Sequence, residues 1–141
     1  MNNYFQYEWY RNNEPIKNNN YSMNNIMLDN PKTGFEKGNM FNNLYSQYKN
    51  YSPAKIETQN EKEKMLMDIS AICFAAHELN LYLDLNPDDQ STFMLFMDYE
   101  KKANRMIEEY ERMYGPLNIN NEDMKSFTWA TDKWPWEVRN V

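Results

Sequence analysis

Two rows of apolar residues at helical spacing, separated by a short polar break, most constrain the fold of this 141-residue chain. The first row continues for more than five turns at spacings of four and three residues, and its members are Met65, Ile69, Ile72, Ala76, Leu79 and Leu83. The second row repeats this spacing with Phe96, Tyr99, Ala103, Met106, Tyr110 and Met113. The pattern predicts two amphipathic helices.

Local signals predict where these helices begin and end. Thr58 and Glu61 have the spacing of a capping box, which predicts a first helix over residues 58–84. Pro87 disfavours helical backbone in the residue before it and suits the first position of a helix, so we predict that Asn86 caps a second helix over residues 87–114. Gly115 and the proline after it end that helix. With so short a connection, the helices are expected to run antiparallel and to pack along the two rows.

The sequence before the predicted hairpin has a different composition. Asn occurs fifteen times in residues 1–60 and seven times after them, and seven of the eleven tyrosines precede residue 52. Asn favours turns, and no regular period is visible, so we predict a mostly irregular N-terminal arm over residues 1–57. Residues 58–141 would hold the hairpin and a C-terminal tail rich in Trp. The predicted fold is therefore mainly α: an antiparallel two-helix hairpin with an extended arm and this tail.

The sequence offers few groups for catalysis or metal binding. The single histidine, His77, lacks a second ligand at metal-site spacing, and we expect it to be packed or to cap a helix. The single cysteine, Cys73, lies among apolar residues and is expected to be buried. The carboxylates are explained by solvated helix faces and by helix capping. We therefore expect no enzymatic activity, no metal and no cofactor.

Charge and hydropathy restrict the partners. The net charge of −6 and the absence of a basic stripe argue against nucleic-acid binding. The longest apolar stretch, residues 69–76, is too short to span a membrane. Residues 1–11 do not show the basic and apolar regions of a signal peptide, so we expect the protein to be made and kept on the cytosolic side.

Three blocks of sequence together resemble the CotJB family of bacterial spore-coat proteins. Residues 78–84 read ELNLYLD and are followed by NPDD at 86–89, then YGPL at 114–117, then WPWE at 134–137. The resemblance spans about residues 61–138. It implies a small inner-coat component, made in the mother-cell cytoplasm and encoded beside a manganese-catalase-like coat protein. Residues 37–48 (KGNMFNNLYSQY) weakly resemble the sister CotJA family, although Gln47 stands where that family has Pro.

The resemblance implies a structural adaptor that binds other coat proteins, most notably the manganese-catalase-like protein. For the contact residues we predict two aromatic pairs. Phe41 and Tyr45 are four residues apart in a segment that has aromatic side chains without periodicity, and Trp134 and Trp136 flank a stiffening proline. The alternative is a cytosolic helical interaction module, a regulator or chaperone, unrelated to the coat. We also consider oxidative cross-linking of the arm's tyrosines, against the alternative that they act as adhesive contacts.

Overall fold

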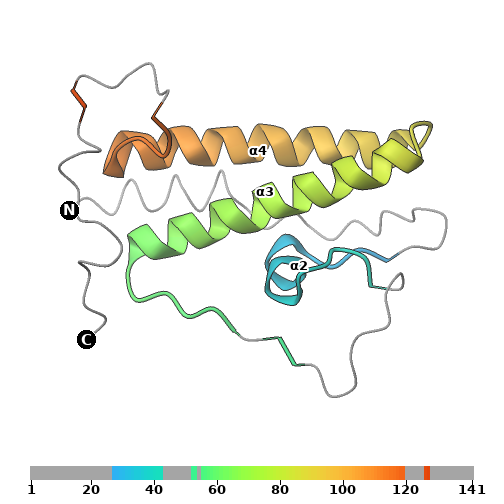
Figure 1. The fold of residues 1–141 in the computed structure, drawn as a ribbon, viewed down its shortest axis with the longest axis horizontal. Coiled ribbons are helices and arrows are strands. Elements are labelled where there is room, and N and C mark those ends of the chain that lie inside the picture. Colours follow the sequence, from blue (N-terminus) through green and yellow to red (C-terminus); the bar gives the residue numbers. More distant parts are fainter. Residues whose placement is uncertain (1–26, 43–51, 54, 120–125, 128–141) are drawn as a thin grey trace.

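The computed structural model describes residues 27–42, 52–53, 55–119 and 126–127, and this part of the chain is mainly helical (Figure 1). Its helices are α2 (Pro31–Lys37), α3 (Glu61–Leu85) and α4 (Gln90–Tyr114). Helices α3 and α4 pack side by side with a four-residue connection, so the two predicted helices are confirmed, each with a start three residues later than expected. No helix in the described part is long and apolar enough to cross a membrane.

The start of α3 uses a different capping box from the predicted one. Asn60 is the N-cap: its Oδ1 accepts a hydrogen bond from the backbone N–H of Glu63 at 2.9 Å. The Glu63 carboxylate accepts in return from the backbone N–H of Gln59 at 2.7 Å. The predicted pair, Thr58 and Glu61, lies two residues upstream of these positions. The prediction was wrong because the two spacings overlap, and Asn is as good an N-cap as Thr.

The turn between the long helices also differs from the prediction. Asn86, expected to cap α4, instead ends α3, where its backbone N–H and its Nδ2 both donate to the carbonyl of Tyr82. Asp89 is the N-cap of α4, and its Oδ1 accepts from the backbone N–H of Thr92 at 3.1 Å. Pro87 therefore lies in the turn. A carboxylate at the N-cap accepts a hydrogen bond from a backbone N–H group that has no partner within the helix. The positive end of the helix dipole also stabilises its negative charge.

The contact between α3 and α4 largely follows the two predicted rows. The buried members of both rows are Met65, Ile69, Ile72, Ala76, Leu79, Tyr99, Ala103, Met106 and Tyr110. Leu83 and Phe96 are only partly buried, and Met113 is 44% exposed in the last turn of α4. Thr92 and Leu95 are buried instead. The face of α4 is thus rotated slightly from the predicted one and begins one turn earlier.

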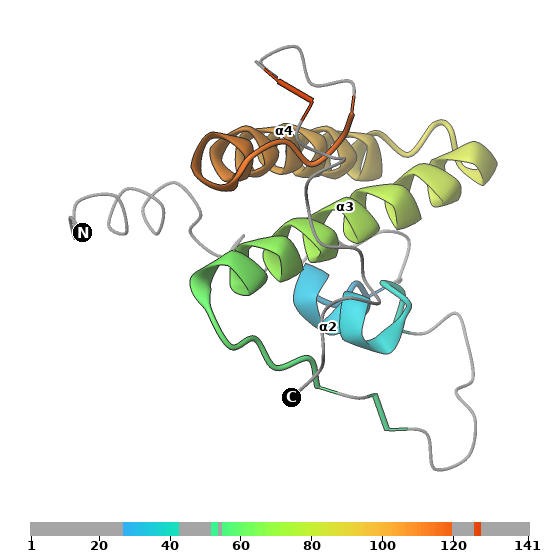
Figure 2. The same ribbon diagram turned by 60° about the vertical axis from the view of Figure 1, so that its left-hand side comes forward.

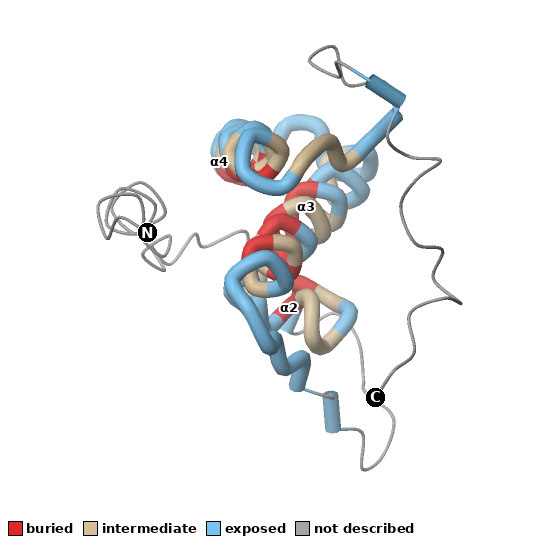
Figure 3. The backbone as a smooth tube through the Cα atoms, turned by 90° about the vertical axis from the view of Figure 1, so that its left-hand side faces the viewer, coloured by how far each residue is buried: buried red, intermediate tan, exposed pale blue. Residues whose placement is uncertain are grey.

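Helix α3 is buried on two sides because it lies between α4 and α2 (Figures 2 and 3). Its second buried row comprises Met67, Ala71 and Ala75, which lie off the row that faces α4. The two alanines of this row leave room for a neighbouring segment to approach closely. This arrangement explains the apolar stretch at residues 69–76, which is too continuous for a helix with one buried face.

Helix α2 was not predicted, because it lies within the arm that we expected to be mostly irregular. Its signals are a capping Asn30, whose Oδ1 accepts from the N–H of Thr33 at 2.9 Å, and Pro31 in the first turn. Gly38 ends the helix with φ at 77°, a conformation that glycine adopts without strain. The remaining arm, residues 1–26 and 43–51, and the tail at 128–141 lie outside the described residues.

The stop of α4 at Gly115 is confirmed. The N–H of Gly115 donates to the carbonyl of Glu111 at 3.0 Å, and its φ is 101°. Leu117 then folds back: its N–H donates to the Glu111 carboxylate at 2.8 Å, and its side chain packs against the core. The chain therefore turns toward the hairpin at the point where the tail begins.

Candidate functional site: a docked segment on helix α3

Residues 27–42, which we call the clasp, form a closed unit around α2. An antiparallel bridge pairs Leu28 with Phe41. The N–H of Asp29 donates to the carbonyl of Met40, and that of Asn42 to the carbonyl of Met27, both at 2.9 Å. The two ends of the clasp are therefore joined by backbone hydrogen bonds, with α2 between them.

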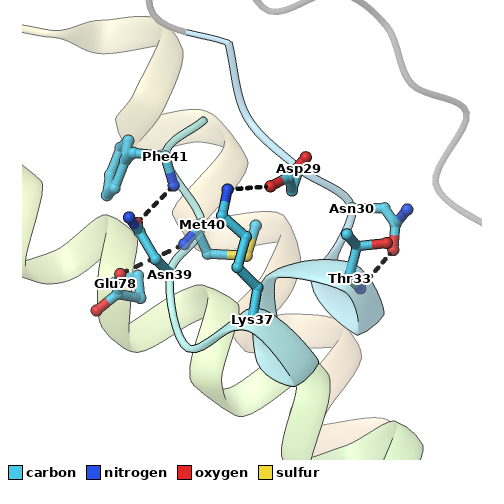
Figure 4. A network of polar contacts seen from close by, with 8 residues as sticks. All are labelled: Asp29, Asn30, Thr33, Lys37, Asn39, Met40, Phe41 and Glu78. Atoms are coloured by element: carbon cyan, nitrogen blue, oxygen red, sulfur yellow. Dashed lines mark hydrogen bonds and ion pairs between the residues drawn. The ribbon is translucent and has the colours of Figure 1, made fainter. Parts of the chain in front are cut away.

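Polar side chains close the clasp further (Figure 4). The ammonium group of Lys37 lies 2.8 Å from the Asp29 carboxylate, and the side chains of this ion pair are 12% and 17% exposed. Asn39 Oδ1 accepts from the backbone N–H of Phe41 at 2.8 Å. Water and salt screen a shielded ion pair less than a surface pair. These contacts fix the loop that presents Met40 and Phe41 to α3.

Gly34 is required by the packing inside the clasp. A Cβ at this position would overlap the Sδ of Met40, and Met40 is fully buried, so its side chain has little room to move. Glycine normally weakens a helix interior by about 1 kcal/mol relative to alanine. Here it is the residue that lets α2 close over Met40.

The clasp contacts three residues of α3, Phe74, Glu78 and Tyr82. They are spaced by four and therefore share one face of the helix. The ring of Phe35 meets Phe74 edge to face at 5.8 Å between centroids, and the ring of Phe41 lies 5.5 Å from that of Tyr82. Between these ring pairs, the N–H of Met40 donates to a carboxylate oxygen of Glu78 at 3.5 Å. The arrangement is a docking site for an apolar segment.

Tyr82 links this site to the turn of the hairpin. Its hydroxyl donates to the Asp89 carboxylate at 3.2 Å, and Ser91 donates to the same carboxylate at 2.7 Å. Burial alone would raise the pKa of Asp89, but the hydrogen bonds from Ser91, Thr92 and Tyr82 outweigh burial and hold that pKa below its usual value. One side chain, Tyr82, therefore contacts both the clasp and the N-cap of α4.

The charges of lysines on all three helices act on the Asp68 carboxylate of α3. Burial raises the pKa of Asp68, while the charges of Lys64, Lys32 and Lys102 partly oppose this rise. Burial also lowers the pKa of Lys102, an effect that Asp68 opposes. Desolvation thus outweighs attraction for both groups.

The structure places one of the four predicted contact residues. Phe41 is 5% exposed and lies in the core of its own chain, so its ring is engaged within the molecule. Tyr45, Trp134 and Trp136 lie outside the described residues, and their contacts remain predictions. The sequence analysis missed Met40, Phe74 and Tyr82 as docking residues. The signals that could have found the clasp are the capping Asn-Pro pair and Gly38, which bracket a short helix.

The groups considered for chemistry do not converge in the described part of the chain. Among these residues, no set of three His, Cys, Asp or Glu side chains is placed to hold a metal ion. His77 is exposed on α3, so the prediction that it is packed or capping was wrong. Cys73 is partly rather than fully buried, and burial followed by the charge of Glu100 raises the pKa of its thiol. A raised thiol pKa disfavours the nucleophilic thiolate.

Comparison with protein families supplies the identity of the hairpin. The family model described as CotJB protein matches residues 63–137, more than half of the chain. The chain belongs to the CotJB family. This membership confirms the resemblance found in the sequence and indicates a protein of the bacterial spore coat. No curated protein and no solved structure matches the chain.

The CotJB match divides the chain at the start of α3. It contains nearly all of α3, the whole of α4 and the tail as far as Glu137, including Trp134 and Trp136. The clasp lies outside it. In this CotJB protein, therefore, a segment outside the family's own region covers one face of the family's first long helix.

Proposed function

We propose that this CotJB protein is a non-enzymatic structural component of the endospore coat that holds another coat protein, a manganese-catalase-like protein, in place. The observation that carries the proposal is the family match over residues 63–137. The described residues form a helical hairpin with a segment of the same chain docked on α3, and this arrangement is consistent with a structural role.

We assign the contact with the enzyme to Tyr45, Trp134 and Trp136. Phe41, which the sequence analysis grouped with Tyr45, is occupied by its contact with Tyr82, so we give it a structural role. Tyr45 is the third residue after the clasp in the sequence. Large aromatic side chains at a few positions commonly dominate the energy of an interface.

Affinity capture from sporulating cells tests this assignment. A tagged wild-type chain is expected to capture the manganese-catalase-like protein, and a Tyr45→Ala, Trp134→Ala, Trp136→Ala variant is expected to lose most of it. Leu85→Ala is the matched control, because Leu85 is 85% exposed and its loss leaves the packing unchanged. Circular dichroism of the purified chains verifies that all three keep the same helicity.

One result would overturn the adaptor role, and another would overturn the assigned contact residues. If the wild-type chain captures no catalase-like protein, the adaptor role is wrong. If the triple variant captures as much as the wild type, the role stands and the contact lies elsewhere. The alternative of a cytosolic interaction module predicts synthesis in vegetative cells, whereas the coat function predicts synthesis confined to sporulation, and an immunoblot time course distinguishes the two.

A further inference from the structure

The clasp satisfies many of its polar groups within itself. The backbone N–H groups of Asp29 and Asn42 bond to carbonyls at the other end of the clasp, and Lys37 pairs with Asp29. The caps of α2 are also internal, with Asn30 at the start and Gly38 at the end. A segment whose polar groups are satisfied internally can leave or reach an apolar surface without exposing unpaired donors and acceptors to that surface.

The site that the clasp occupies faces outward from the hairpin. Helix α2 contacts α3 but, among the described residues, not α4, and Figure 3 shows α2 and α4 on opposite sides of α3. Helix α2 and helix α4 therefore pack on different sides of α3, although Met40 and Phe41 of the clasp share one core cluster with residues of α4. The site can exchange one clasp for another without opening the hairpin.

The chain between the clasp and α3 is long enough for such an exchange. Eighteen residues separate Asn42 from Glu61, a length that spans up to about 60 Å when extended. This connection lies outside the family match, as the clasp does. The clasp is thus a closed apolar segment attached by a long connection to the site that it fits.

We propose that the clasp of one chain also docks on α3 of a second copy of this chain, so that copies join by exchanging clasps. A tether of eighteen residues gives the chain's own clasp an effective concentration of about a millimolar. In dilute solution each clasp therefore occupies its own α3. When the protein concentration approaches a millimolar, the clasp of a neighbour competes on equal terms. This inference is independent of the proposed binding of an enzyme.

Two complementary variants of the full chain test the exchange. Gly34→Val prevents the clasp from closing over Met40 and leaves the α3 face intact, so this chain is an acceptor. Phe74→Arg removes the ring that meets Phe35 and places a charge on the α3 face, so this chain is a donor with an intact clasp. Since Phe74 is only partly buried, the hairpin is expected to tolerate the arginine.

Light scattering gives the mass of each sample. Neither variant alone has both an intact clasp and an open site, so each variant should be a monomer on its own. The measurement is made at about 0.1 mM, well below the effective concentration of a tethered clasp. An equimolar mixture should approach twice the 17.1 kDa of one chain. In the control mixture, Thr33→Val replaces the acceptor. This change adds the same side chain at an adjacent exposed position, leaves the site filled by its own clasp, and should give no increase in mass.

A mixture that stays monomeric up to a millimolar overturns the proposal, as does a control mixture that gains as much mass as the test mixture. If circular dichroism shows that either variant has lost helicity, Met40→Asp serves as the acceptor and Phe74→Glu as the donor. The expected results are the same. Loss of capture of the catalase-like protein does not affect these results, so failure of the adaptor role and failure of clasp exchange are distinguished.

Discussion

Leu79 is the residue whose truncation tests the packing of the fold most sharply. It is fully buried and belongs to the core cluster that joins α3 and α4 with Met40 and Phe41 of the clasp. Replacing a buried leucine by alanine lowers the free energy of unfolding by about 2–5 kcal/mol, because apolar contacts are lost and a cavity is left behind. The described part of the chain, at about 0.05–0.15 kcal/mol per residue, has a total stability of roughly 4–13 kcal/mol.

At the middle of these two ranges, Leu79→Ala should therefore remove about 40% of the free energy of unfolding. In a urea titration followed by circular dichroism, this loss lowers the midpoint by on the order of 2 M, given a slope of about 1–3 kcal/mol per molar urea. Leu79→Asp should leave the chain unfolded, because it also buries an unpaired carboxylate.

Leu85→Ala is the matched control for this series. It makes the same change on the same helix at a residue that is 85% exposed, and such surface changes stay within about 0.5 kcal/mol. Equal midpoints for Leu79→Ala and Leu85→Ala would refute the arrangement of the core.

Three further predictions concern charge and the tail. Since the pKa of Asp89 is held low in the folded state, its contribution to stability is present above pH 3.8 and is lost as the pH falls through the folded value. Asp89→Asn keeps a capping side chain and should reduce the acid dependence of the unfolding midpoint; an unchanged dependence contradicts this. The pH dependence that Asp68 contributes has the opposite sign, because its pKa is raised in the folded state. Its contribution to stability is present below pH 3.8 and is lost as the pH rises through the folded pKa. Asp68→Asn should therefore gain stability relative to the wild type between pH 3 and pH 7, and a loss over this range would contradict the assignment. Truncation after Asp132 removes Trp134 and Trp136, so it should abolish a blue shift of tryptophan fluorescence on addition of the partner; fully solvated indoles in the wild-type complex would contradict their role as contacts.

The long helices were predictable because each has more than five turns of regular spacing, over which errors at single positions average out. Their ends were less predictable. Thr58 and Asn60 both precede a glutamate by three residues, and Asn86 and Asp89 are both good caps, so only the three-dimensional packing decides between them. Local chemistry therefore fixed the type of cap but not the exact residue.

The clasp was not predictable from periodicity because α2 has only seven residues, fewer than two full turns. Its stability depends on contacts between residues far apart in the sequence, such as Phe35 with Phe74 and Phe41 with Tyr82. The sequence analysis expected the Phe41 ring to lie on a surface that it placed in a partner protein. It did not identify that surface as α3 of the same chain, since no local signal in α3 distinguishes a face covered by a clasp from one covered by a partner.

The most direct test of the proposed function is the amount of the manganese-catalase-like protein retained in purified spores. Spores that lack this CotJB protein should have lost most of that enzyme from the coat, while the enzyme's turnover in solution stays the same with and without the CotJB protein. Restoring the wild-type gene should restore retention. Spores that keep the full amount of enzyme without this protein would contradict the adaptor function.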